Sequence, residues 1–230
     1  MTKKLGMFLA LCLGWVVALR ADDAAAPKTH PNSTGWQNLF AADLSNATYP
    51  KGVWSFENGV LTATKDENIW TNKSYGDCII DLEFQNSPGA NSGIFVYGQG
   101  DLKSWANSVE IQILDDGAPK WAKVANTWRC GAIFGRLAPV KSAVKKPGQW
   151  NRMTITCKGP KISVLLNGAM VTQFDMKKWT SAKKNPDGSE IPSWLVDKPL
   201  AEYTPQGRIG LQGKHGEAPI YFRNIKIKPL

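Results

Sequence analysis

The residues best suited to chemistry lie along residues 107–115, where polar and apolar side chains alternate. This period of two predicts a strand that buries its apolar side chains and turns Glu110 and Gln112 to the other face, roughly 7 Å apart. A carboxyl group and an amide on an ordered sheet surface suit binding or acid–base catalysis. The alternative is an ordinary solvated face, which most alternating strands of antiparallel sheets have.

His215 is the second candidate, because it is the only histidine in the predicted domain, His30 lying in the N-terminal leader. An imidazole with an ordinary pKa near 6.5 can accept or donate a proton around neutrality. Gly213 and Gly216 flank it, so a loop could present the ring. We therefore predict His215 and Glu110 as the catalytic acid or base residues, against the alternative of a structural histidine.

The same region predicts a candidate metal site. Glu110, Gln112, Asp115 and His215 offer oxygen ligands and one imidazole, a set that suits a divalent cation such as calcium or manganese, although no spacing motif requires one. Asp115 shares the face of Glu110 only if a one-residue bulge falls between them. Otherwise Asp115 is a turn residue.

The elements that must position these residues are almost wholly β. Asn58-Gly59 and Asn167-Gly168 each separate two apolar runs, which is typical of a tight hairpin. Further strands are predicted at residues 78–85, 93–97, 109–114, 131–134, 153–157, 208–212 and 220–228. Many short strands favour a sandwich or a barrel. Residues 177–200, rich in Pro and Gly, predict one long irregular loop of the kind that borders sites.

The N-terminus has the pattern of an export signal. Lys3 and Lys4 precede an apolar run at residues 5–19, which is shorter than the roughly 20 residues that span a bilayer. Small residues follow, so we expect a signal peptide at 1–21, a mobile leader at 22–35 and a single domain at 36–230. The protein is then periplasmic or extracellular, with no membrane span.

The composition and charge of the chain limit the classes of molecule that it is expected to bind. The 230 residues carry a net charge of +9 with scattered lysines, and no nucleic-acid-binding module is recognisable, so nucleic acid is not an expected partner. Three cysteines follow the signal: Cys78, Cys130 and Cys157. Export permits a disulfide between Cys78 and Cys157, but their spacing does not establish one.

Several short motifs occur in an order that resembles one family. They are Asn91-Ser92-Gly93-Ile94-Phe95, Glu110-Ile111-Gln112-Ile113-Leu114-Asp115, Gly131-Ala132-Ile133-Phe134-Gly135, Gly148-Gln149-Trp150-Asn151, Asn167-Gly168, residues 207–215 and Tyr221-Phe222-Arg223-Asn224-Ile225. Together they resemble the 3-keto-disaccharide hydrolase domain over roughly residues 35–230. The resemblance implies an all-β fold: a two-sheet antiparallel jelly-roll sandwich, concanavalin-like, with a concave sugar-binding face.

The resemblance also implies a substrate, an oligosaccharide or glycoside already oxidised at C3. A ketone at C3 acidifies the C2 proton, so a base can remove it, the C1 substituent can leave and water can add back. This route needs a base, an acid and stabilisation of the enolate. His215 and Glu110 are the candidates for the chemistry. Candidate substrate contacts are Gln112, Asp115, Asn91, Trp105, Trp128, Lys214 and Arg223.

Two other functions remain open at this point. Residues 110–115 superficially resemble the two-carboxylate strand of laminarinase-like retaining glycosidases, but Gln112 replaces the middle carboxylate and Asp115 the distal Glu. The other alternative is a non-catalytic carbohydrate-binding module, which would need the aromatic side chains but not His215.

Overall fold

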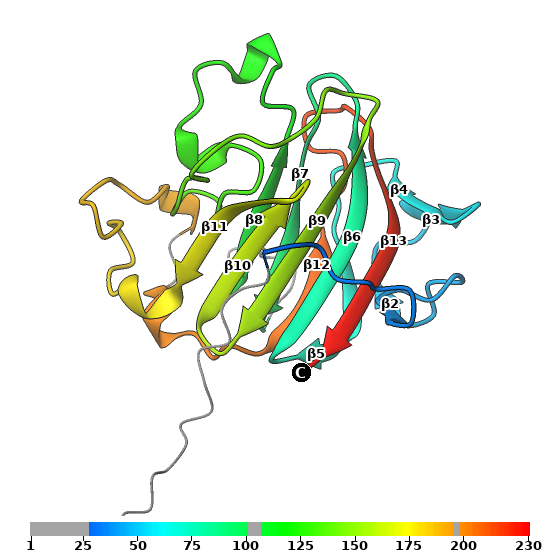
Figure 1. Ribbon diagram of the computed structural model, residues 1–230, viewed down its shortest axis with the longest axis horizontal. Helices are drawn as coiled ribbons and strands as arrows, with labels where there is room; N and C mark the ends of the chain where they lie inside the picture. The colour runs from blue at the N-terminus through cyan, green and yellow to red at the C-terminus, as the bar shows by residue number, and fades with distance from the viewer. Residues whose placement is uncertain (1–27, 101–106, 196–197) are drawn as a thin grey trace, which may run out of the picture.

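Two antiparallel β-sheets packed face to face make up the protein (Figure 1), as seen in a computed structural model that describes residues 28–100, 107–195 and 198–230. The larger sheet has the strand order β11-β10-β9-β6-β13-β4-β3, and β1 pairs with β13. The smaller sheet has the order β2-β5-β12-β7-β8. The predicted all-β, two-sheet antiparallel sandwich is confirmed.

The strands are short, as the sequence predicts. Their bounds are β1 Gln37–Asn38, β2 Ala47–Thr48, β3 Trp54–Glu57, β4 Val60–Ala63, β5 Ile69–Tyr75, β6 Cys78–Asn86, β7 Asn91–Gly98, β8 Val109–Leu114, β9 Trp150–Lys158, β10 Lys161–Leu166, β11 Ala169–Asp175, β12 Gly207–Leu211 and β13 Ile220–Pro229. Single 3₁₀ turns lie in the connections: η2 Pro119–Trp121, η3 Asn126–Trp128, η4 Met176–Lys178, η5 Ser193–Leu195 and η6 Leu200–Glu202.

The core lies between the sheets and is built from alternate residues of each strand. On β8, Ile111 and Ile113 are fully buried in the same apolar cluster as Ile94 of β7 and Ile80 and Ile155 of the larger sheet. Because side chains alternate along a strand, this packing turns the polar residues of β8 to the opposite face. The pairing of β8 with β7 has no register shift, so the bulge that would bring Asp115 onto that face is absent.

Both predicted hairpins are present. Asn58 and Gly59 have φ of 52° and 78° between β3 and β4, and Asn167 and Gly168 have φ of 49° and 80° between β10 and β11. Two successive positive φ angles match the right-handed twist of the flanking strands, which is why Asn-Gly marks such turns.

The structure differs from the sequence prediction at residues 131–134 and at three strands that were not predicted, the two-residue strands β1 and β2 and the longer β5. Residues 131–134 form no strand, although Gly131 and Phe134 donate backbone hydrogen bonds to β8 carbonyls at 2.8 and 3.0 Å. Gly131 and Gly135 have positive φ, which interrupts an extended chain there. Conversely, β5 was not predicted, because the exposed residues Asn72, Lys73 and Ser74 conceal its strand pattern.

The N-terminal segment docks on the outer face of the larger sheet, where it crosses β9 and β6 (Figure 1). His30 Nδ1 lies 2.8 Å from the Thr154 hydroxyl, and the Ser33 hydroxyl donates to Asp81 at 2.6 Å. Asp81 also pairs with Arg152 at 2.7 Å. Residues 30–33 are thus held in place where a mobile leader was expected; the rest of that leader up to residue 27, and the signal, lie outside the described residues.

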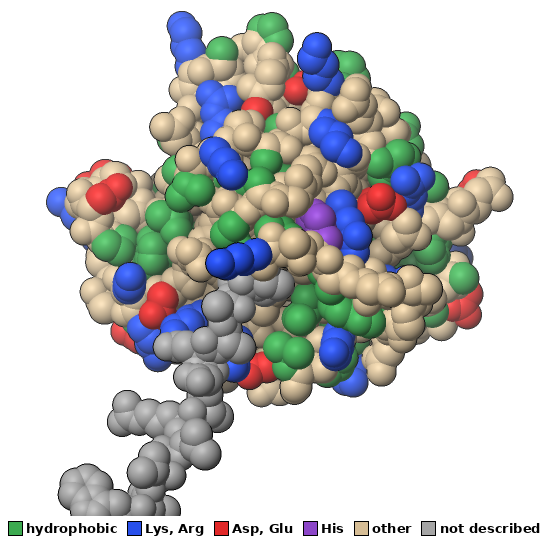
Figure 2. Space-filling model, viewed as in Figure 1, with side chains coloured by type: hydrophobic (Ala, Val, Ile, Leu, Met, Phe, Trp, Pro, Cys, Tyr) green, Lys and Arg blue, Asp and Glu red, His purple; other side chains and the backbone are tan. Residues whose placement is uncertain are grey.

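Cys78 and Cys157 stand opposite each other on β6 and β9. Both are buried free thiols, as is Cys130, so the conceivable disulfide is not formed. No helix in the described part of the chain is both long and apolar enough to cross a membrane. Figure 2 shows Lys and Arg side chains spread over the face of the larger sheet rather than gathered in one patch.

Candidate functional site

A cavity of about 380 Å³ lies over the outer face of the five-stranded sheet. Five residues predicted from the sequence line it: Asn91, Glu110, Gln112, Trp128 and His215. The remaining lining residues are Asp66, Glu67, Asn68, Phe134, Trp194 and Gln212. The cavity therefore unites β7, β8 and four separate connections, and we take it as the candidate active site.

One row of paired residues across the sheet fixes the floor of this cavity. Trp70 of β5, Gly210 of β12, Phe95 of β7 and Glu110 of β8 are successive neighbours in register. A Cβ on Gly210 would lie 2.6 Å from the Trp70 ring, so glycine lets that ring lie across β12 and stack on Phe95 at 5.2 Å. Glu110 is thereby placed at the end of an apolar row.

Glu110 is almost completely buried, at 8% exposure. Its carboxyl group lies over Gly93 of β7, where a Cβ would be 2.2 Å from Oε1, so only glycine leaves room for it. Burial, together with the negative charge of Asp66, raises the pKa of Glu110 to about 8. The carboxyl group is therefore mainly protonated at neutral pH, which suits a proton donor.

His215 forms a close pair with Asp66. Its Nδ1 lies 2.6 Å from Asp66 Oδ2, and both side chains are about half exposed. The hydrogen bond that His215 donates to Asp66 raises the pKa of His215 above its ordinary value, against the opposing effects of burial and Lys120. A histidine whose Nδ1 is held by a carboxylate keeps Nε2 for proton transfer, the arrangement that recurs in acid–base catalysis.

A close crossing of two loops brings this pair together. A Cβ on Gly213 would lie 2.2 Å from the carbonyl oxygen of Lys65 and 2.8 Å from that of Glu67. Glycine at this position lets the loop before β13 touch the loop before β5, which carries Asp66. The backbone of His215 also forms a bridge with Asn91 of β7. Contacts with the loop before β5 and with β7 thus fix the position of His215.

Gln112 and Asn91 form the amide part of the floor. Gln112 Nε2 donates to Asn91 Oδ1 at 2.9 Å, and Gln112 is only 1% exposed. Gln112 Oε1 is buried and has no hydrogen-bond partner. A buried amide oxygen without a partner carries a desolvation cost of about 1–3 kcal/mol, which a ligand donor entering the cavity could relieve.

Aromatic side chains form the other wall. The ring centroid of Trp128 lies 4.8 Å from that of Phe134 and 6.2 Å from that of Trp194. Trp128 ends η3, and Trp194 belongs to η5 in the long segment after β11. This segment is irregular, as predicted for residues 177–200. The cavity therefore has an amide and carboxyl floor and an aromatic wall, a combination suited to sugar rings.

Several predicted contacts lie elsewhere. Asp115 accepts backbone hydrogen bonds from Gly89 at 2.8 Å and Gly117 at 3.3 Å, so it is the turn residue of the two alternatives and does not line the cavity. Lys214 neighbours His215 but pairs with exposed Glu217 at 3.5 Å. Trp105 lies outside the described residues.

Arg223 belongs to the other sheet. It lies on β13, donates to Glu83 at 2.8 Å and covers the Trp150 ring at 4.0 Å. Its guanidinium is therefore occupied on the larger sheet, away from the residues that line the cavity.

Of the four expected cation ligands, Glu110, Gln112 and His215 line the cavity, whereas Asp115 is bound by backbone amides outside it. Within residues 28–100, 107–195 and 198–230, no group of three or more His, Cys, Asp or Glu side chains is arranged to hold a metal ion. The donor set does not fit a calcium or manganese site.

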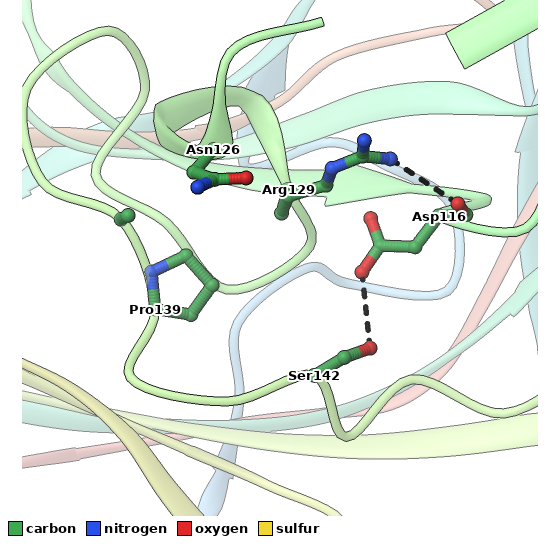
Figure 3. A pocket seen from close by; sticks show the side chains of 6 residues that line it. Asp116, Asn126, Arg129, Pro139 and Ser142 are labelled. Carbon is green, nitrogen blue, oxygen red and sulfur yellow. Dashed lines mark hydrogen bonds between the residues drawn. The ribbon is translucent and has the colours of Figure 1, made fainter. Parts of the chain in front are cut away.

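A second cavity, of about 450 Å³, lies beyond β8 and contains Asp116, Asn126, Arg129 and Ser142 (Figure 3). The Asp116 carboxyl group accepts from the Cys130 amide at 2.9 Å and from the Ser142 hydroxyl at 3.2 Å, while Arg129 donates to the backbone oxygen of Asp116 at 3.2 Å. These bonds tie three loop segments together, so we interpret the cluster as structural.

The sequence reasoning missed Asp66, Trp194 and Gln212. Asp66 sits in an acidic loop with no distinguishing motif, and its contact with His215 spans 149 positions. Gln212 directly follows β12, and its alternation with the buried Leu211 was the only signal available. Trp194 lies in the predicted long loop, where an exposed tryptophan is itself a signal for binding.

Comparisons with known proteins show which family and which fold the chain resembles. A family model described as the 3-keto-alpha-glucoside-1,2-lyase-like domain matches residues 32–228. The crystal structure of a protein named "Putative glycosyl hydrolase" from Parabacteroides distasonis is 54% identical, with a TM-score of 0.81 over 85% of this chain and 99% of that one. No curated protein matches the chain.

More distant structures share the fold. A second protein of the same name and organism is 23% identical, with a TM-score of 0.63 over 81% of this chain and 89% of that one. A Bacillus subtilis protein with a galectin-like fold is 12% identical, with a TM-score of 0.53 over 83% of this chain and 92% of that one. The predicted concanavalin-like sandwich is confirmed by these neighbours.

Proposed function

The chain belongs to the family of 3-keto-alpha-glucoside-1,2-lyase-like domains, and on this premise we propose that it is an exported hydrolase that cleaves glycosides oxidised at C3. One observation carries the proposal: a buried carboxyl group, whose pKa burial raises to about 8, shares a cavity with an Asp–His pair. Export rests on the N-terminal lysines and apolar run.

The reaction begins at C2 of the oxidised ring. A base takes the C2 proton, and the C–H electron pair forms the C2–C3 double bond of an enolate whose charge rests on the C3 oxygen. When the C3 carbonyl forms again, the electron pair shifts to a C1–C2 double bond and the C1–O bond breaks. The leaving oxygen takes a proton. Water then adds its hydroxyl to C1 and a proton to C2, which completes hydrolysis.

His215 is the base in this scheme. Asp66 orients the ring through Nδ1 and stabilises the imidazolium that forms when Nε2 takes the C2 proton. The raised pKa of His215 makes its neutral imidazole a stronger base. Asp66 acts through the imidazole, so we assign it as a positioning residue.

Glu110 is the acid. Its proton can be donated to the enolate oxygen or to the leaving oxygen, because its pKa near 8 keeps it neutral at physiological pH. The sequence alone left the acid and base roles of Glu110 and His215 undivided, and the buried environment of Glu110 favours the acid. Gln112 and Asn91 are suited to bind the hydroxyl groups of the ring, through the unpaired Gln112 Oε1 above all.

Two alternatives are less well supported. A retaining glycosidase needs two carboxyl groups about 5–5.5 Å apart on either side of the bond. Asp115, the expected partner of Glu110, is instead bound to Gly89 and Gly117. A binding module needs neither a protonated carboxyl group nor an Asp–His pair, so neither observation favours it.

The test pairs a 3-keto-glucoside with its unoxidised parent. We expect turnover of the oxidised glycoside only, with loss of a C2 deuterium label, and the same rate with and without chelator. Glu110→Gln and His215→Ala should each lower kcat by about 10²–10⁴-fold. Equal turnover of the unoxidised parent would support a retaining glycosidase instead. Binding of the glycosides without turnover would support a binding module. Wild-type rates in both variants would refute the roles assigned to Glu110 and His215.

The pH profile gives a sharper readout. The rate should rise as His215 loses its proton and fall as Glu110 loses its own near pH 8. Asp66→Asn removes the main cause of the raised His215 pKa and the charge that raises the Glu110 pKa, so both limbs should move to lower pH. A profile that keeps its shape in Asp66→Asn would exclude this division of roles.

A further inference from the structure

Trp194 is an exposed aromatic side chain at the edge of the candidate active site. It is 55% exposed, and the other large apolar side chains in the described residues with comparable exposure are Val140 and Leu230, neither of which is aromatic. Trp194 nevertheless lines the cavity and meets Trp128 edge to face, at an interplanar angle of 88°. Trp194 and Trp128 thus present adjacent aromatic faces at the edge of the cavity, where a ligand in the cavity would contact them.

The position of Trp194 is fixed by its neighbours. Leu195 packs on Gly135, where a Cβ would lie 2.4 Å from the leucine side chain, and the Leu195 carbonyl oxygen accepts from Arg136 Nη2 at 3.1 Å. Arg136 is only 6% exposed. Because the following residue is clamped in this way, Trp194 is held over the cavity without having to be buried.

The same segment is tied down a second time, farther from the cavity. Asn185 donates to the Gly135 carbonyl oxygen at 3.3 Å and accepts from Trp179 Nε1 at 2.8 Å. Both sets of contacts end at Gly135 and Arg136, in the turn after residues 131–134. Residues 131–134 are themselves hydrogen-bonded to β8. The tryptophan and the catalytic strand are therefore parts of one connected structure.

The floor of the cavity is polar, whereas its wall is aromatic and apolar. Asn91, Glu110 and Gln112 are buried polar groups, which impose directional hydrogen bonds and so suit the oxidised ring. Trp128 and Trp194 offer apolar ring faces, and stacking on them requires only a flat partner. A substrate whose reacting ring lies on the polar floor must send its C1 substituent elsewhere, and the aromatic wall is the surface that can receive it.

We propose that Trp194, together with Trp128, forms the subsite for the group that leaves from C1, and that this group carries a flat ring. The ring is the apolar face of a second sugar or an aromatic aglycone. This inference rests on the proposed function for the identity of the reacting ring. Trp194 then determines which leaving groups are accepted, without taking part in bond breaking.

The test compares Trp194→Ala, Trp194→Phe and the wild type on three 3-keto-glucosides: a disaccharide, an aryl glycoside and the methyl glycoside. We expect Trp194→Ala to raise KM about three- to tenfold for the first two, with kcat little changed and the methyl glycoside unaffected. Trp194→Phe should restore most of the loss. An effect on only one ring-bearing substrate identifies the source of the ring, while an equal effect on the methyl glycoside overturns the inference.

Calorimetry separates this inference from the proposed function. Binding of the unoxidised disaccharide and aryl glycoside is measured for the wild type and for Trp194→Ala, with Val140→Ala as an exposed control away from the cavity lining. Weaker binding only in Trp194→Ala supports the subsite even if no 3-keto-glycoside is turned over. Unchanged binding and unchanged KM overturn the subsite even if turnover confirms the proposed function.

Discussion

At the scale of single residues, the site depends on a carboxyl group whose environment opposes its charge. Burial raises the pKa of Glu110, and the negative charge of Asp66 adds to this effect. The same Asp66 holds the imidazole of His215 through a hydrogen bond. Two titratable groups in one cavity with different environments are the usual basis for dividing acid and base roles.

This arrangement should cost stability, and the cost should depend on pH. The folded-state pKa of Glu110, about 8, exceeds its ordinary value of 4.5, so between these values the folded state holds a proton that the unfolded state releases. The free energy of unfolding therefore falls as pH rises through this window, by on the order of a few kcal/mol in total. Glu110→Gln removes the titration. Its melting temperature, relative to wild type, should be higher at pH 8.5 than at pH 5.

Thermal melts of both proteins at the two pH values check this expectation. Asp115→Asn is a suitable control, because Asp115 is likewise a buried acid and directly follows the strand that carries Glu110, but it accepts hydrogen bonds from backbone amides. If Glu110→Gln shifted the melting temperature equally at both pH values, the raised pKa would be wrong.

At the scale of elements, β8 and β7 act as one unit. β8 supplies the acid, and β7 supplies Gly93, which leaves the space that the acid occupies. The alternation of β8 could be read from the sequence because burial on one side demands it, and both Asn-Gly turns could be read because few residues tolerate their φ angles. The importance of Gly93 could not be read from the sequence, because Gly93 meets the Glu110 side chain only when β7 and β8 pair.

Gly93→Ala tests that unit. Its new Cβ would overlap the Glu110 carboxyl group and displace it, because the alternative is to move a paired strand. We expect kcat to fall by about 10²-fold and stability by about 1–3 kcal/mol. Gly35→Ala, where a Cβ meets no atom within 4 Å, is the matched control and should leave kcat unchanged. A Gly93→Ala enzyme with full activity would show that the position of Glu110 is not critical.

At the scale of the whole molecule, the outer faces of the two sheets differ: one carries the candidate site and the other is covered by chain. The smaller sheet carries the cavity, while the larger sheet is covered on its outer face by the N-terminal segment. Neither this docking nor the Asp66–His215 contact could be predicted from local patterns, because both join residues more than 100 positions apart through polar side chains. The sandwich itself was predictable, since many short strands separated by turns favour it and strands such as β4 and β6 alternate buried and less buried residues.

The N-terminal docking predicts a difference between two truncated chains. A chain that starts at residue 28 keeps the bonds of His30 and Ser33 to Thr154 and Asp81, whereas one that starts at residue 36 loses them and leaves Asp81 less well satisfied. The shorter chain should melt roughly 3–8 °C lower, with unchanged activity per folded molecule. Differential scanning calorimetry and the glycoside assay measure both quantities, and equal melting temperatures would argue against the docking.

The aromatic wall has a consequence for how such an enzyme changes over generations. Bond breaking is assigned to β8 and to the loop before β13, whereas the wall is carried by Trp128 and by the segment that contains Trp194. Substitutions in that segment can alter the range of accepted leaving groups while the proton donor and acceptor keep their places. Different segments thus carry the proposed leaving-group subsite and the proposed proton donor and acceptor, so the range of accepted glycosides can change while the reaction stays the same.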